Sequence, residues 1–169
     1  MQLQPLSEDL IRKFLQERSA AELAERLPGE VRPGGVLSVP LLLHIAAKIA
    51  SRLGRDERLT RTAVLGPLLD YVEDRDRARG FAPPAGAREK LEALAWQMRI
   101  ASGRTSFDAG LATQAGLTRD DLAQIVRSGL VRKEAFEYSF AHLLIAEYLA
   151  AAYLVRQPPE RFPALLWQS

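Results

Sequence analysis

Apolar residues recur three and four positions apart through most of the chain up to about residue 129, and they alternate with polar residues only after it. Leu10, Ile11, Phe14 and Leu15 form the first such stripe, directly behind Ser7, a residue type that caps helix starts. Spacings of three and four place apolar side chains on one face of a helix. The sequence therefore predicts a mainly α fold, with strands confined to the last third.

Capping residues and helix breakers divide the first part of the chain. Ser19 and Glu22 have the spacing of a capping box, Pro40 suits a first helical turn, and Gly80 is a stop signal. Pro67 predicts a kink or a late start in its helix. The expected helices are one behind Ser7 and others over 19–28, 40–53, 60–79 and 87–101. In the last of these, the residues expected to face inward are Leu91, Leu94, Ala95 and Met98.

The last third has a different pattern. We expect a short helix over Phe107–Ala115 and a second over Arg119–Ser128, the latter capped by Thr118 and Asp121. Residues 130–133 and 136–140 are expected to pair as a hairpin, since Phe136, Tyr138 and Phe140 alternate with polar or small residues as in a half-buried strand. Two helices followed by a hairpin are the outline of a winged helix.

The predicted fold is thus mainly α, a helical bundle followed by a winged-helix subdomain with one short β-hairpin. A long helix over 141–155 is expected after the hairpin, with Gln157-Pro158-Pro159 as its end. The predicted division is a helical subdomain over 1–86, a winged-helix subdomain over 87–156, and the start of a following helical segment over 157–169.

Charge and composition exclude several classes of protein. The 169 residues include 23 basic and 21 acidic ones, a near-balance that argues against a dedicated nucleic-acid binder. There is no cysteine, which excludes disulfides and thiolate metal sites. The longest apolar run, Tyr148–Val155, is short of the roughly 18 residues that a membrane span needs. With no signal-peptide pattern at the start, we expect a cytoplasmic protein without a membrane partner.

The sequence contains no recognisable catalytic motif. A phosphate-binding loop of the G-x-x-x-x-G-K-[ST] type is absent, as are G-x-G-x-x-G, G-x-S-x-G and H-E-x-x-H. The carboxylates of Asp70, Glu73, Asp74 and Asp76 alternate with arginines and are interpreted as a salt-bridged helix surface, not a metal site. We therefore expect no enzyme, no catalytic residue, no metal and no cofactor in this chain by itself.

The two histidines, His44 and His142, have different settings. His44 follows three leucines on an apolar helix, which is typical of a packed or rim histidine. His142 comes directly after the second strand, at a helix start, where backbone N–H groups favour an anion and an imidazole adds a further donor. The residues alone leave two interpretations of His142 open, a packed side chain and a phosphate contact.

The segment around His142 resembles a family signature. Residues 138–151 resemble the F-x-H-x-x-x-x-E-Y-x-A-A signature of NACHT-type STAND NTPases, in which it ends the winged-helix subdomain and opens the next helix. The matching residues are Phe140, His142, Glu147, Tyr148, Ala150 and Ala151. The family's hydroxyl-aromatic-Gln segment is replaced by Leu144-Ile145-Ala146.

Two earlier segments are similar to the same family in order and spacing. Residues 3–11 resemble the L-x-P-L-S-x-x-x-I stretch that follows the family's NTPase core. Residues 38–43 resemble the N-P-L-L-L motif that opens its helical subdomain, with Ser38 and Val39 in place of glycine and asparagine. Residues 65–79 suit the long helix that comes next.

The resemblance implies a regulatory piece of a signalling NTPase. In the family, a Walker domain binds ADP or ATP with Mg²⁺, and the helical and winged-helix subdomains close over the nucleotide and gate activation. That NTPase core would precede Met1 as a partner in the same chain, and a sensor region would follow Ser169. By this resemblance Pro40 packs near the adenine and ribose, and His142 donates to the β-phosphate of ADP. It also implies self-association on activation and a role in bacterial signalling or antiphage defence.

An alternative interpretation is a DNA-binding winged-helix transcriptional regulator. Its recognition helix would be Arg119–Ser128, and its hairpin would carry Arg132 and Lys133. Asp120 and Asp121 argue against it, because they lie at the helix start that base edges or phosphates would approach. Nucleic acid is therefore not the expected partner. An independent enzyme and a plain helical scaffold are the remaining alternatives.

Overall fold

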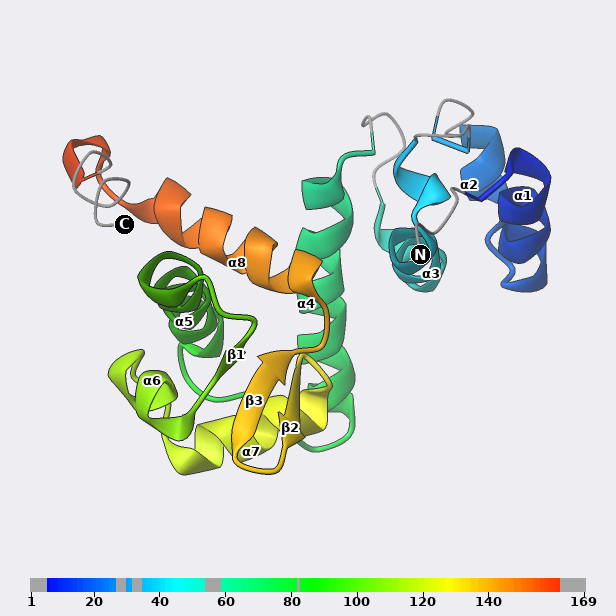
Figure 1. Ribbon diagram of the computed structural model, residues 1–169. Coiled ribbons are helices and arrows are strands. Elements are labelled where there is room, and N and C mark those ends of the chain that lie inside the picture. Colours follow the sequence, from blue (N-terminus) through cyan, green and yellow to red (C-terminus); the bar gives the residue numbers. More distant parts are fainter. Residues whose placement is uncertain (1–5, 27–29, 32–34, 54–58, 82, 162–169) are drawn as a thin grey trace. The chain divides into compact units, whose positions relative to one another are not determined.

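The computed structural model describes residues 6–26, 30–31, 35–53, 59–81 and 83–161 (Figure 1). The mainly α fold with a short β-hairpin is confirmed. The chain divides into two compact units, Met1–Val72 and Glu73–Ser169. The predicted subdomain boundaries at 86/87 and 156/157 stay predictions, because a compact unit need not coincide with a functional subdomain.

The regular elements among the described residues of the first unit are all helices. The helices that begin in it are α1 (Glu8–Glu17), α2 (Ala21–Arg26), η1 (Val36–Ser38), α3 (Pro40–Lys48), η2 (Ala50–Arg52) and α4 (Arg61–Ala78). Ser7 caps α1 as predicted, accepting a hydrogen bond from the Leu10 amide. Ile11 and Leu15 are fully buried, whereas Leu10, which was predicted to belong to the same apolar stripe, is 56 % exposed.

The predicted capping box of Ser19 and Glu22 is not formed. Ser19 has a φ of 56° and belongs to the end of α1, where its amide donates to the Gln16 carbonyl and the Ala20 amide donates to Leu15. These two bonds are the Schellman pattern that closes a helix with a left-handed residue. Since α2 begins only at Ala21, Ser19 is too early to be its N-cap residue.

Helices α3 and α4 differ from the prediction in their bounds. Pro40 occupies the first position of α3 as expected, but the α-helix ends at Lys48 and the chain continues as the short 3-10 helix η2 instead of reaching Leu53. Helix α4 begins at Arg61 and runs through Pro67, so the proline does not delay its start. Gly80, with a φ of 79°, follows the end of α4 as predicted.

Gly35 precedes η1 and could not carry a Cβ, which would lie 2.5 Å from the Glu30 carbonyl oxygen.

The second unit has the order of a winged helix. After the last turn of α4 come α5 (Ala87–Ser102), β1 (Ser106–Phe107), α6 (Ala109–Gln114), α7 (Arg119–Ser128), β2 (Val131–Glu134), β3 (Glu137–Phe140), α8 (Leu143–Arg156) and η3 (Pro159–Arg161). The strands form one antiparallel sheet in the order β1-β3-β2. The hairpin of β2 and β3, called the wing below, lies alongside α7 (Figure 1).

The third strand, β1, is an addition to the predicted hairpin. Phe107 was expected to start a helix, but it pairs with Tyr138 across the sheet, and Asp108 caps α6 one residue later. The Phe107 ring stacks on Tyr138 at 5.6 Å between centroids and tilts against Phe140 at 5.9 Å. These long-range aromatic contacts hold Phe107 in the sheet, and a strand of two residues leaves no periodic signal in the sequence.

Helices α5 and α8 make the most extensive packing in this unit. The four predicted inward residues of α5, Leu91, Leu94, Ala95 and Met98, are all buried. Leu149 of α8 is fully buried as well, and Trp96 stacks on Tyr153 at 5.9 Å. The remaining predicted helix end, Gln157, caps α8. Residues 162–169, most of the predicted following helical segment, lie outside the described residues.

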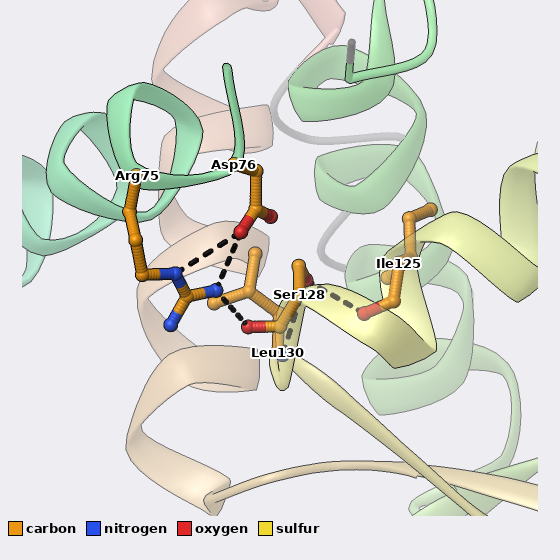
Figure 2. Close-up of polar contacts among 5 residues, drawn as sticks. All are labelled: Arg75, Asp76, Ile125, Ser128 and Leu130. Carbon is orange, nitrogen blue, oxygen red and sulfur yellow. Dashed lines mark hydrogen bonds and ion pairs between the residues drawn. The ribbon is translucent and has the colours of Figure 1, made fainter. Parts of the chain in front are cut away.

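The last turn of α4 is bound to the end of α7 through Arg75 (Figure 2). The Arg75 guanidinium donates to the Asp76 carboxylate at 2.8 and 3.0 Å and to the Ser128 carbonyl oxygen at 2.7 Å. The Ser128 hydroxyl in turn donates to the Ile125 carbonyl oxygen. The carbonyl groups at the end of an α-helix have no hydrogen-bond donor within that helix. The helix dipole also makes a positive charge favourable at this end.

Candidate functional site

His142 connects the wing to α8 and caps that helix. Strand β3 ends at buried Phe140, and the Ala141 amide donates to the Leu130 carbonyl, which fixes the chain direction just before the histidine. His142 itself has extended backbone, and its Nδ1 accepts a hydrogen bond of 3.1 Å from the Leu144 amide. The side chain is exposed. The structure thus gives His142 a capping role that the sequence did not reveal.

The cap fixes which ring nitrogen of His142 is a donor. In neutral imidazole one nitrogen carries the proton and the other accepts. Because Nδ1 accepts from the Leu144 amide, the proton is assigned to Nε2. Within the described residues Nε2 has no hydrogen-bond partner, so an exposed N–H donor is held at a fixed helix start.

The other residues of the signature mostly fasten α8 to its surroundings. The Glu147 carboxylate lies 3.7 Å from Arg99 of α5, and the Tyr148 hydroxyl accepts from Arg88 of α5 at 3.4 Å. Ala150 is buried against the core. These contacts give the matched residues a packing function that places His142, whose own imidazole stays accessible.

A buried carboxylate lies in the same helix pair. Glu92 of α5 is 1 % exposed, and its Oε1 lies 3.2 Å from Arg156 and 3.7 Å from Arg88. Burial raises the pKa of Glu92, and the two arginines oppose that effect. Arg156 also pairs with Glu89, whose pKa is lowered by its own backbone hydrogen bond and by Arg156. This cluster joins α5 to α8, and none of its residues lines the pocket described below, so we interpret it as a structural network.

Pro40, the second predicted nucleotide contact, lies in the first unit. It is exposed at the first position of α3, and its predecessor Val39 makes no side-chain cap. The turn before it is held by Ser38, whose hydroxyl donates to the Gly35 carbonyl at 2.7 Å. Pro40 and His142 therefore belong to different compact units of the chain.

Two of the matched segments meet within the first unit. The Leu6 amide donates to the Ser38 carbonyl oxygen at 3.3 Å, which joins the segment over 3–11 to the one over 38–43. Leu3, Gln4 and Pro5 lie outside the described residues. The contact places Pro40 two residues from the point where these segments join.

His44 lies against an aromatic ring, and three acidic residues of α4 form ion pairs with arginines. His44 is half-buried with its ring 6.3 Å from Phe14, and burial, followed by the charges of Lys48 and Arg18, lowers its pKa. On α4, Arg77 pairs with Glu73 at 3.3 Å and with Asp74 at 3.0 Å. Within the described residues no three His, Asp or Glu side chains come together in a metal-binding arrangement.

The start of α7 is occupied by its own cap. Thr118 and Asp121 form the predicted capping box, and the Asp121 carboxylate also pairs with Lys90 at 3.1 Å. The Thr118 amide is the main cause of the lowered pKa of Asp121, and Lys90 adds to it. At the other end of α7, Arg127 lies over the Phe81 ring at 5.9 Å.

A pocket between α6, α7 and the wing was not predicted. Its volume is about 290 Å³, and its lining is Ala109, Thr113, Arg119, Leu122, Lys133, Ala135, Phe136 and Tyr138. Phe136, predicted to be a half-buried strand residue, is 91 % exposed in the turn before β3. Alternation alone cannot separate a strand residue from the last residue of the preceding turn.

Neither a protein-family model nor a curated protein sequence matches this chain. No helix among the described residues is both long enough and apolar enough to cross a membrane.

Proposed function

We propose that this chain is the helical and winged-helix region of a NACHT-like STAND NTPase, which closes over bound ADP or ATP and gates activation. The proposal rests on the resemblance of three segments and of the expected long helix, and it draws support from the winged-helix order of the second unit. The setting proposed for it is cytoplasmic bacterial signalling or antiphage defence.

The observation that carries the proposal is the exposed Nε2 donor of His142. A neutral imidazole held by its other nitrogen at a helix start is suited to donate to a phosphate oxygen. A hydrogen bond to a charged group contributes about 1.5–3 kcal/mol net. If the bond exists only in the closed, ADP-bound state, it shifts the equilibrium toward that state by its full free energy.

Pro40 has the smaller part in this proposal. Its exposed ring at the first position of α3 offers an apolar surface against which an adenine or ribose could pack. The NTPase core would hold Mg²⁺ and the phosphates and would carry out hydrolysis. This chain by itself is therefore proposed to be no enzyme, and we expect it to bind ADP poorly because it supplies one wall of the site.

The DNA-binding alternative has weaker support. The exposed cations Arg119, Arg132 and Lys133 favour it. Against it, Asp120 and Asp121 occupy the first turn of α7, where the field of two carboxylates repels phosphate. We expect weak, non-specific retention of duplex DNA that falls steeply with added salt. A sequence-specific footprint that is lost on changing Arg119 would replace our proposal with this one.

The test separates capping by His142 from phosphate binding, in the complete protein with its NTPase core. His142→Ala removes both the cap and the donor, whereas His142→Asn keeps a preferred N-cap residue and removes the imidazole Nε2 donor. We expect both variants to release a fluorescent ADP about 10- to 150-fold faster, at 1.4 kcal/mol per tenfold. Only His142→Ala should also lose about 1 kcal/mol of stability.

Asp108→Ala is the matched control, because Asp108 caps α6 in the same unit through the Leu111 amide at 2.8 Å. It should lower stability by about 1 kcal/mol and leave ADP release unchanged. An unchanged release rate in His142→Asn would show that His142 acts only as a cap and would overturn the phosphate role.

The reading frame before Met1 gives an independent test of the family. A Walker A and Walker B pair encoded there would support the proposal. A promoter and a stop codon directly before Met1 would contradict it and favour a free-standing regulator.

A further inference from the structure

The pocket between α6, α7 and the wing combines an apolar floor with two cations. Leu122 is buried beneath it, and Ala109 and Tyr138 add apolar wall. Arg119 enters from the first position of α7 and Lys133 from β2. A volume of about 290 Å³ is at the lower end of ligand pockets, which suits one or two side chains and not a large cofactor.

The charges of the lining have one sign. Both charged residues that line the pocket, Arg119 and Lys133, are basic, and neither has a carboxylate partner within the part of the chain that the structure describes. Lys133 instead lies over the Tyr138 ring at 5.7 Å. Asp120, Glu134 and Glu137 are exposed nearby but do not line the pocket. The pocket therefore favours an anionic group placed beside an apolar one.

The tip of the wing presents an aromatic side chain on strained backbone. Phe136 is 91 % exposed, and its neighbour Ala135 has a φ of 52°, a region that L-residues other than Asn and Asp rarely adopt. Glu134 pairs with Glu137, so Ala135 and Phe136 form a two-residue turn. A solvent-exposed aromatic ring beside a pocket is characteristic of protein-binding surfaces, where such residues supply much of the binding free energy.

The start of α7 disfavours a phosphate as the anion. A helix start binds phosphate through free backbone amides, but here the Asp121 amide donates to the Thr118 hydroxyl and the Thr118 amide donates to the Asp121 carboxylate. Asp120 adds a second negative charge in the same turn. A singly charged carboxylate on a flexible peptide meets less repulsion than a polyphosphate or a nucleic-acid backbone.

We propose that this pocket binds a short acidic peptide segment of a partner protein, with carboxylates at Arg119 and Lys133 and an adjacent aromatic or aliphatic side chain against Phe136 and Leu122. His142 does not line the pocket, so this site is separate from the proposed nucleotide contact and does not depend on it.

The test uses the full 169-residue chain and a fluorescein-labelled peptide, Glu-Leu-Asp-Phe-Glu, followed by fluorescence polarisation. The comparison peptides are Gln-Leu-Asn-Phe-Gln, which lacks the charges, and Glu-Ser-Asp-Ser-Glu, which lacks the apolar groups. Single- and double-stranded oligonucleotides serve as competitors. We expect only the first peptide to bind appreciably, more weakly as salt is raised because exposed charges are screened.

Matched variants test whether peptide binding depends on the residues that line the pocket, and not merely on the charge or the exposed apolar side chains of the chain. Phe136→Ser should weaken binding about tenfold, as loss of a central aromatic contact does. Arg119→Ala and Lys133→Ala should each weaken it about three- to fivefold, as loss of one exposed ion pair does. Arg132→Ala is the control for Lys133, because successive strand residues point to opposite faces, and Val155→Ser is the control for Phe136, since Val155 is 79 % exposed on α8. Both controls should change binding less than about twofold.

Three outcomes would overturn the proposal, given variants that fold normally by circular dichroism. The first is equal binding of the charged and uncharged peptides, or no binding of either. The second is equal loss in Arg132→Ala and Lys133→Ala. The third is an oligonucleotide that binds more tightly than the peptide and loses affinity in Phe136→Ser, which would assign the pocket to nucleic acid.

Discussion

The α5–α8 interface and the face between α7 and the wing use similar residues in opposite ways. In the interface, Glu92 is buried with Arg156 beside it, and Trp96 is covered by Tyr153. On the wing face, Lys133 lies over an aromatic ring and has no carboxylate partner among the described residues, and Phe136 is 91 % exposed. The buried carboxylate and the tryptophan of the interface are thus covered by partners within the unit, whereas Lys133 and Phe136 on the wing face stay exposed.

This difference separates the scaffold of the unit from its surfaces for binding. Groups whose partners lie in the same unit add to its stability and fix the direction of α8, and with it the position of His142. Groups without such partners add little to stability and remain available for a ligand. Substitutions in the two regions should therefore differ in what they change.

The largest effect on stability should come from the interface. Leu94→Ala removes a fully buried side chain of α5 and should lower the free energy of unfolding of the second unit by about 2–5 kcal/mol, as large-to-small core substitutions do. Urea unfolding followed by Trp96 fluorescence, with Trp167→Phe as background, measures it. Phe136→Ser in the same background should change it by less than about 0.5 kcal/mol. Comparable losses in both variants would remove the distinction between the regions.

A smaller, pH-dependent effect should come from Glu92. Burial raises its pKa above the ordinary 4.5, so the folded state holds this proton more tightly than the unfolded state. Its contribution to stability is therefore greatest at low pH and falls as the pH rises from 4.5 through the raised pKa. Glu92→Gln carries no charge and should be at least as stable as the parent chain at pH 7, with an advantage that grows with pH in that window.

Urea unfolding from acid to neutral pH checks the Glu92 prediction. If the pairs with Arg156 and Arg88 outweigh the cost of burial, Glu92→Gln will instead lose stability relative to the parent chain as the pH rises. That result would mean that the buried charge contributes net stability to the interface.

The smallest effect should come from the tip of the wing. Ala135→Gly removes a Cβ from backbone with a φ of 52° and should raise the free energy of unfolding by about 0.5–1 kcal/mol, since glycine adopts this region freely. Thermal unfolding by calorimetry measures the change. A variant that is no more stable than the parent chain would show that the turn is unstrained. The wing face would then differ from the α5–α8 interface only in the exposure of its side chains.

Local signals in the sequence predicted most of the helices. The Thr118–Asp121 capping box, Gly80 and Gly129 at helix ends, and the inward residues of α5 all lie as expected, because each depends on neighbours within one or two turns. The elements that were missed depend on distant contacts. Strand β1 exists through pairing with β3, and Ser19 serves the preceding helix instead of the next one.

The candidate site was predictable only in part. The place of His142 after a strand and before a helix followed from the sequence, but histidine is not a preferred N-cap residue, so the bond from the Leu144 amide to its Nδ1 was not foreseen. The pocket beside the wing joins residues that are up to 29 positions apart, from Ala109 to Tyr138, and no short motif marks such a set.

Arg75 has a consequence for moving the winged helix into another protein. Its bond to the Ser128 carbonyl comes from α4, and the Phe81 ring under Arg127 comes from the segment just after α4. Both residues precede α5, the first helix of the winged-helix fold. A transplanted segment that starts at Ala87 would lack both side chains, and the end of α7 would then be exposed to water. One that starts at Glu73 would keep them, so the smallest portable form of this winged helix includes the last turn of the helix before it.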